Sequence, residues 1–411
     1  MYLARHGRLE EADRILATLA ATGSPQERAW AFEHWGVVSV LRDGDVAKAE
    51  KKERGALRLD PDLVMAHDNL AGDEILLGHD GSAETQLKAE YKVLKSHRAD
   101  QLTPAVRPVL SAWSHARLDE GLGDFRGAAR DIHPAQDLAD YRGSSHAAFL
   151  NEAATLALAH DVTASRALLA SADRPAGASS FQESFGWGSN LLPEISQDVA
   201  LDDWAAMIRD LKSAQAGPSF ILGPTAMRTY VEPWLAWSTA MSGDHAGAAA
   251  LIAATPTDCY LCLRIRGKLA AAASDRAGAA GWFAAATRAA PSLPFAWLEW
   301  GQMLAAKGDI AGAIAMYRAA HLKGPAFADP LEAWGEALIR RGDLDGAIGR
   351  FAAADAFAPR WGRLHLMWGE ALDAMNQRAA ARGQWRAAAG IDLSAADRAA
   401  LAAKLTARPR P

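Results

Sequence analysis

Apolar residues recur along most of the chain at the three- and four-residue spacing of an amphipathic helix, and short polar turn signals interrupt them. A Lys-Gly-Asp turn at 307–309 and an Arg-Gly-Asp turn at 341–343 each lie between two apolar stripes. Each unit therefore predicts a first helix, a tight turn and a second, antiparallel helix, here called helix A and helix B. The pattern as a whole predicts an all-α protein.

One stretch repeats this pattern in strict register. From Tyr260 to Ala395 four units follow one another with a period of 34 residues, shown by the spacing of Trp300, Trp334 and Trp368. The other columns are a glycine, an alanine, an aromatic residue, a second alanine and a closing proline: Gly267, Gly301, Gly335 and Gly369; Ala279, Ala313, Ala347 and Ala381; Phe283, Tyr317, Phe351 and Trp385; Ala286, Ala320, Ala354 and Ala388; Pro291, Pro325 and Pro359. A fixed period of this length indicates a repeat protein.

Each column has a physical role. Gly335 and Ala347 stand where helices A and B would cross, and their small size lets the two backbones approach, so that Trp334 and Phe351 fill the space beside them. Pro359 then stops helix B, because proline lacks an N–H group and restricts the residue before it. One helix pair cannot bury its apolar face alone, so we expect neighbouring pairs to stack.

These residues resemble the tetratricopeptide (TPR) repeat, which has the same 34-residue period with glycine, alanine, aromatic and proline columns. The match is strong over residues 260–395 and degenerate over residues 1–259. The resemblance implies an α-solenoid, a superhelix of about ten antiparallel helix pairs.

The pattern divides the chain into segments of different regularity. Within the irregular middle, glycines, serines and prolines predict a loop around Trp187, followed by one helix over residues 201–214, and Pro233 should kink the helix after it. The predicted segments are degenerate repeats with a truncated first unit over 1–173, an irregular segment over 174–224, a degenerate pair over 225–259, four regular repeats over 260–395, and a cap helix with a tail over 396–411.

Composition adds several exclusions. The chain has 411 residues and a formal net charge of −5, with no run rich in lysine or arginine, so binding to nucleic acid is not expected. Its apolar runs are too short to span a membrane. The sequence as given shows no secretory signal, so we expect a cytoplasmic protein.

Because Met1 falls inside an expected helix A, we also expect a fragment or a misassigned start, with further segments upstream.

No catalytic constellation is found. No histidine lies in an H-E-x-x-H or similar metal spacing, no G-x-S-x-G motif occurs, and no cofactor site is expected. Cys259 and Cys262 have the C-x-x-C spacing of redox or metal sites, but zinc needs about four ligands and no second pair exists. The favoured interpretation is two small apolar residues at the start of a helix, without a disulfide framework.

The resemblance also points to binding residues, because in this family the inner face of helix A lines a groove that holds a peptide. By position, the groove residues are Arg264, Lys268, Glu299, Gln302, Glu332, Glu336, Glu370 and Asp373. The groove would be basic at one end and acidic across the last three repeats, which suits a partner rich in lysine or arginine. Lys268, Glu299 and Asp329 differ from the subclass that grips a C-terminal carboxylate, so that mode is not expected. Ordinary solvated carboxylates are the alternative, and Glu336 could pair with Arg340.

The sequence therefore predicts a non-catalytic scaffold that binds a protein or peptide partner in its concave face. The alternative is the sensor or regulatory arm of a larger signalling protein or transcription regulator, with its output domain upstream of Met1. A third hypothesis, an enzyme, rests on the irregular segment with Trp187, Asp202 and Asp203. Self-association through the apolar edge of the truncated first unit is a further expectation.

Overall fold

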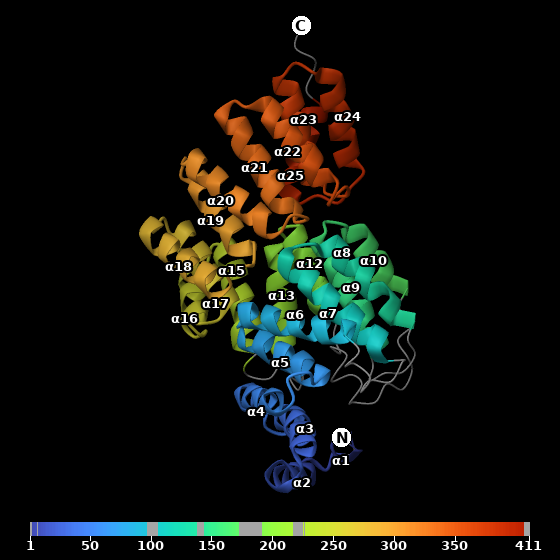
Figure 1. The fold of residues 1–411 in the computed structure, drawn as a ribbon. Coiled ribbons are helices and arrows are strands. Elements are labelled where there is room, and N and C mark those ends of the chain that lie inside the picture. The colour runs from blue at the N-terminus through green and yellow to red at the C-terminus, as the bar shows by residue number, and fades with distance from the viewer. Residues whose placement is uncertain are drawn as a thin grey trace.

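The computed structural model describes residues 2–5, 7–96, 106–137, 144–171, 191–216, 225 and 227–406. Every regular element in this part of the chain is a helix, and most successive helices form antiparallel pairs (Figure 1). The predicted all-α solenoid of helix pairs is therefore confirmed. No helix among the described residues is long and apolar enough to cross a membrane.

The first half of the molecule, here residues 2–216, begins at the blue end of the ribbon in Figure 1. Its helices are α1 (Tyr2–Arg5), α2 (Leu9–Thr22), α3 (Pro25–Asp43), α4 (Val46–Leu59), α5 (Val64–Leu77), α6 (Asp80–Lys95), α7 (Val106–Leu122), α8 (Phe125–Ile132), the 3₁₀ helix η2 (His133–Asp137), α9 (Ser144–Leu158), α10 (Val162–Ser171), α12 (Leu191–Ala200) and α13 (Trp204–Ala216).

The second half, here residues 225–406, contains the regular repeats. Its helices are the π-helical turn η3 (Met227–Val231), α15 (Glu232–Met241), α16 (His245–Ala253), α17 (Tyr260–Ala272), α18 (Arg276–Ala289), α19 (Phe295–Ala306), α20 (Ile310–Lys323), α21 (Ala328–Arg341), α22 (Leu344–Asp355), α23 (Gly362–Ala374), α24 (Arg378–Ala389) and the closing helix α25 (Ala395–Thr406). Asp397 donates its backbone N–H to the Ser394 hydroxyl at 3.2 Å, which caps the start of this last helix.

The glycine column has the predicted role. A Cβ atom added at Gly335 would lie 2.5 Å from the ring of Phe351, and one added at Gly301 would lie 2.5 Å from Tyr317. Only a missing side chain lets helices A and B approach this closely. The large filler is the aromatic residue of helix B, because Phe351 is fully buried whereas Trp334 is only partly buried against the same core.

Aspartates make the turns between helices A and B. At the turn before α22, Gly342 has a φ of 83°, and Asp343 accepts a hydrogen bond from the Gly346 N–H at 3.0 Å. Glycine adopts this left-handed conformation without strain, and aspartate satisfies an N–H group at the helix start that lacks an acceptor within the helix. The turn before α8 is built in the same way by Gly123 and Asp124, so the degenerate half uses the predicted turn chemistry.

The irregular middle is more helical than predicted. Helix α12 occupies Leu191–Ala200, which the sequence pattern assigned to a loop, and α13 follows it after a short turn. Ile195 of α12 is buried in one cluster with Met207 and Val231, which compensates for the poor helical signal of this segment. At Pro233 the expected kink takes the form of a boundary, since the π-helical turn ends there and α15 begins. Trp187 lies outside the described residues.

The two halves dock on one another, which the repeat pattern did not predict. Turns of the first half meet the loops between repeats of the second half, and the green and teal helices lie beside the later repeats in Figure 1. The Tyr260 N–H donates to the Gly78 carbonyl oxygen at 2.7 Å. The ring of His160 stacks on Trp361 at 3.8 Å between centroids, and Gly123 packs against Phe327. The superhelix thereby closes on itself.

Candidate functional site

Docking of the two halves forms a cavity of about 770 Å³. We call it the central chamber. Its walls come from the turns after α5, α9 and α12, from α15, and from the inner faces of α17 and α19. Aromatic side chains dominate these walls: Phe125, Trp204, Tyr230, Trp234, Trp237, Tyr260, Phe295 and Phe327. A mainly apolar cavity of this size with a few polar groups is typical of a ligand-binding site.

Three charged side chains converge on the floor of the chamber. Arg264 of α17 donates two hydrogen bonds to the two carboxylate oxygens of Glu299 on α19, at 2.9 and 2.7 Å. The ammonium group of Lys268, one turn further along α17, lies 3.9 Å from the same carboxylate. Since Arg264 already occupies both oxygens, Lys268 is left with a weaker ionic contact.

Lys268 lies instead against aromatic faces. Its Nζ atom is 4.1 Å from the ring centroid of Trp237 and 5.7 Å from that of Trp234. Burial lowers the pKa of Lys268 and raises the pKa of Asp80, which also lines the chamber. Both shifts have the same cause, because a site shielded from water disfavours a charged group.

The acidic end of the predicted groove has a different arrangement. Arg363 of α23 forms ion pairs with Glu332 at 3.5 Å and Asp397 at 2.9 Å, and it also binds Glu336. Burial, and then the neighbouring Glu336, raise the pKa of Glu332 well above its usual range. Further along, Glu370 pairs with Lys404 of α25 at 2.7 Å. Glu336 thus pairs with Arg363 and not with the Arg340 that the sequence suggested.

The eight predicted groove residues fall into two groups. Four of them, Arg264, Lys268, Glu299 and Gln302, line the central chamber. The other four, Glu332, Glu336, Glu370 and Asp373, lie on α21 and α23, and we call them the acidic strip. The two cations that hold the acidic strip, Arg363 and Lys404, were not predicted from the sequence. Arg363 lies one repeat beyond Asp329, so the repeat register itself could have identified it.

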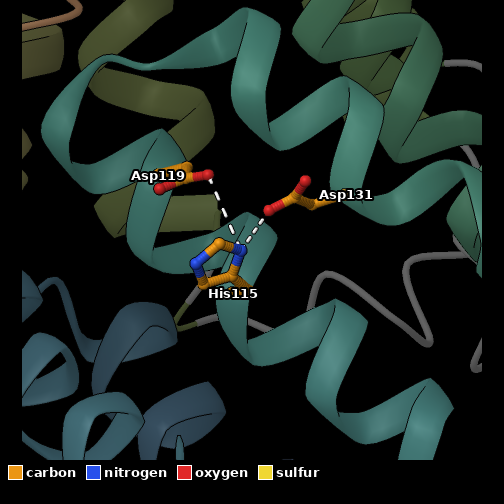
Figure 2. A group of neighbouring side chains, drawn as sticks. All are labelled: His115, Asp119 and Asp131. Atoms are coloured by element: carbon orange, nitrogen blue, oxygen red, sulfur yellow. Dashed lines mark hydrogen bonds and ion pairs between the residues drawn. The ribbon is translucent and has the colours of Figure 1, made fainter.

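A separate polar group lies on the outside of the first half. His115 and Asp119 project from α7, and Asp131 from α8, so that one ligand atom from each lies within 4.8 Å of the others (Figure 2). A histidine and two carboxylates could ligate a divalent cation. However, Asp131 binds both His115 and Arg130, so the group satisfies its own charges. The i, i+4 spacing of His115 and Asp119 was the available sequence signal, but it matches no longer metal-binding motif.

The cysteine prediction was wrong. Cys259 and Cys262 form a disulfide in the first turn of α17, where both are fully buried, and the Sγ atom of Cys259 accepts a hydrogen bond from the Cys262 N–H. The two cysteines are three residues apart at a helix start, which brings their sulfurs together. A total of two cysteines excludes a framework of several disulfides but not one bond within a helix turn.

The aspartates of the enzyme hypothesis have separate positions. Asp203 caps α13 by accepting a hydrogen bond from the Ala206 N–H at 3.0 Å, while Asp202 lines the central chamber.

No profile of a known protein family matches the chain, and no curated protein matches its sequence. Solved structures with a similar fold include yeast Tom70, with a TM-score of 0.44, 13% identity, and coverage of 98% of this chain and 94% of that chain. A monomeric mutant of IFIT1 with Gppp-AAAA has a TM-score of 0.46 and 14% identity, covering 97% of this chain and 85% of that one. Pseudomonas aeruginosa PilF has a TM-score of 0.37 and 12% identity over 42% of this chain and 81% of that one. These neighbours are TPR-type repeat proteins, and the likeness concerns the helical-repeat architecture alone.

Proposed function

We propose that this protein is a non-catalytic interaction scaffold whose acidic strip binds a segment of a partner protein that is rich in lysine or arginine. The carrying observation is a charge imbalance. Four carboxylates, those of Glu332, Glu336, Glu370 and Asp397, share the two cations Arg363 and Lys404 among the described contacts, and Asp373 adds a fifth carboxylate on α23.

Exposure supports this assignment. The side chains of Glu336 and Glu370 are 28% and 34% exposed, so both can reach a partner while each still contacts its internal cation. Holding the carboxylates in place beforehand reduces the ordering cost of binding. Glu332 is buried and its raised pKa favours the neutral form, so it supports the strip without contributing full charge.

The experiment compares partner capture by the parent and by a Glu336→Lys, Glu370→Lys variant, using affinity purification from the source cells and quantitative mass spectrometry. A partner held through the acidic strip should be lost by the variant, since each reversal replaces attraction with repulsion. Circular dichroism and thermal melting establish that the variant is folded.

The matched control is an Asp258→Lys, Asp345→Lys variant, which has the same change in net charge. Both aspartates are exposed, and neither belongs to the acidic strip or the central chamber. It should retain the partner. Equal capture by parent, test variant and control would contradict the proposal.

A further inference from the structure

The central chamber has a chemistry of its own, distinct from the acidic strip. We propose that it is a binding site for a small ligand that combines an apolar, preferably aromatic, body with one negatively charged group. The anionic group would bind Lys268, and the body would lie against Trp204, Trp234 and Trp237. This site goes beyond the proposed scaffold function and does not depend on it.

The size and shape of the chamber favour a small molecule. Its volume of about 770 Å³ lies within the range of small-molecule sites, roughly 300–1,000 Å³. Its walls come from both halves of the molecule, since Asp80 and Trp204 precede Tyr260 by many residues and face the same cavity as Gln302. A cavity lined from several sides suits a small molecule, whereas a long groove would suit an extended chain.

The charges favour an anion. Glu299 is engaged by Arg264 through both oxygens, so the charge of Lys268 is only partly compensated. The structure gives the Lys268 ammonium no hydrogen bond to any described residue, although its side chain is only 19% exposed. A buried cation that retains free N–H donors gains strongly from an anionic acceptor.

A cationic ligand is disfavoured by the same geometry. Tryptophan faces bind cations, but Lys268 already lies over Trp237 and Trp234, 4.1 and 5.7 Å from their ring centroids. A second cation would compete for these faces and would be repelled by Lys268 and Arg264. Burial raises the pKa of two other carboxyls at the chamber wall, Asp80 and Asp202, so both offer reduced charge to a cation. The third, Asp329, lies 3.2 Å from a ring nitrogen of His160.

The test uses three probes with one shared body: 2-naphthylacetate, 2-naphthylacetamide and 2-(2-naphthyl)ethylamine, which carry charges of −1, 0 and +1 at pH 7. Isothermal titration calorimetry on the full chain measures each affinity. The acetate should bind about ten- to a hundredfold more tightly than the amide, the usual gain from a charge-assisted hydrogen bond. The amine should bind most weakly.

Lys268→Met keeps the aliphatic stem and removes the charge, so it should abolish the preference for the acetate while binding of the amide persists. Lys268→Arg should keep the preference. Lys323→Met is the matched control, because Lys323 lies 5.6 Å over the Trp297 ring outside the chamber. It should behave as the parent.

Equal affinities for the three probes, no binding of any probe, or an unchanged preference in Lys268→Met would each overturn the proposal. These results leave the acidic strip untouched, because partner capture by the Glu336→Lys, Glu370→Lys variant is measured separately.

Discussion

The second helix pair and the third regular repeat solve the same packing problem with opposite chemistry. At Gly335 the space left by the missing side chain is filled by the ring of Phe351, whereas at Gly36 it is filled by the carboxyl group of Glu53. Both fillers are fully buried. The glycine that permits the close approach is common to both regions, and the side chain that uses it is not. The repeat register is therefore set by the close crossing of the two helix backbones. A segment that keeps few of the other repeat residues can still retain this register.

The difference has an energetic consequence. Burial raises the pKa of Glu53 well above its usual range, and the neighbouring Glu33 and Asp73 raise it further. The second helix pair thus fills this position with a carboxyl whose burial favours the protonated form, while the third regular repeat fills it with an aromatic ring.

The largest expected effect is a loss of stability as pH rises. The pKa of Asp73 is raised to about 8, and those of Glu120 and Asp198 to about 7, mainly by burial. Between pH 5 and 7 the folded chain therefore binds more protons than the unfolded chain, and each such group lowers the unfolding free energy by on the order of 1 kcal/mol per pH unit. Urea midpoints at pH 5 and 7 measure this. Asp73→Asn should show a weaker pH dependence, and a midpoint that rises with pH would contradict the account.

The next largest effect on the unfolding free energy should come from replacing Phe351 or Glu53, the side chains that fill the space beside Gly335 and Gly36. Phe351→Ala should lower the unfolding free energy of the C-terminal repeats by about 3–5 kcal/mol, since it leaves a cavity beside Gly335. Glu53→Leu should be neutral or stabilising at pH 7, because an apolar side chain replaces a buried carboxyl. Chemical denaturation monitored by circular dichroism measures both, and equal destabilisation would remove the distinction between the regions.

Two glycine-to-alanine substitutions test whether the glycine column is required for the close approach of helices A and B. Gly335→Ala should cost about 1–3 kcal/mol, because its Cβ would lie 2.5 Å from the Phe351 ring. Gly349, in helix B of the same repeat, has nothing within 4 Å of an added Cβ. Gly349→Ala should therefore stabilise by about 0.5–1 kcal/mol through helix propensity. Melting temperatures that move in the same direction for both variants would show that close approach is not the determinant.

The smallest of these effects concerns the disulfide. Reducing the bond between Cys259 and Cys262, or replacing both with serine, should cost no more than about 2 kcal/mol, because the loop it closes is very short. Differential scanning calorimetry with and without reductant measures this. A loss several times larger would mean that the bond also holds the docked turn at Gly78, which packs against Cys259.

Much of the fold could be predicted from local residue chemistry. Gly342 specifies its turn through a positive φ, and Asp343 does so by capping the next helix. Gly335 specifies a close helix crossing. These residue types recur with the 34-residue period, so the period revealed both the turns and the crossings. Helix α12 could not be predicted, because Pro193 and nearby glycines are turn signals and the helix depends on burial of Ile195 in a tertiary cluster.

The candidate site was only half predictable. The repeat register correctly placed Arg264, Lys268, Glu299 and Gln302 on one inner face. It could not place Trp204 or Asp80 opposite them, because these residues reach the chamber only when distant turns dock. Likewise, the repeat register predicted an acidic surface that includes Glu336 and Glu370. Their pairing with Arg363 and Lys404 could not be predicted, because it depends on the angle between successive repeats.

Amide hydrogen exchange at Tyr260 reports on the docking of the two halves. Tyr260 is the first residue of α17, and a helix's first N–H groups have no acceptor within the helix. The structure gives this N–H the Gly78 carbonyl as its acceptor, whereas Leu344, the first residue of α22, has no such distant acceptor among the described contacts. Residue-resolved exchange should show Tyr260 protected like the interior amides of α17 and Leu344 exchanging fast. Equally fast exchange at both amides would contradict the closed superhelix and its chamber.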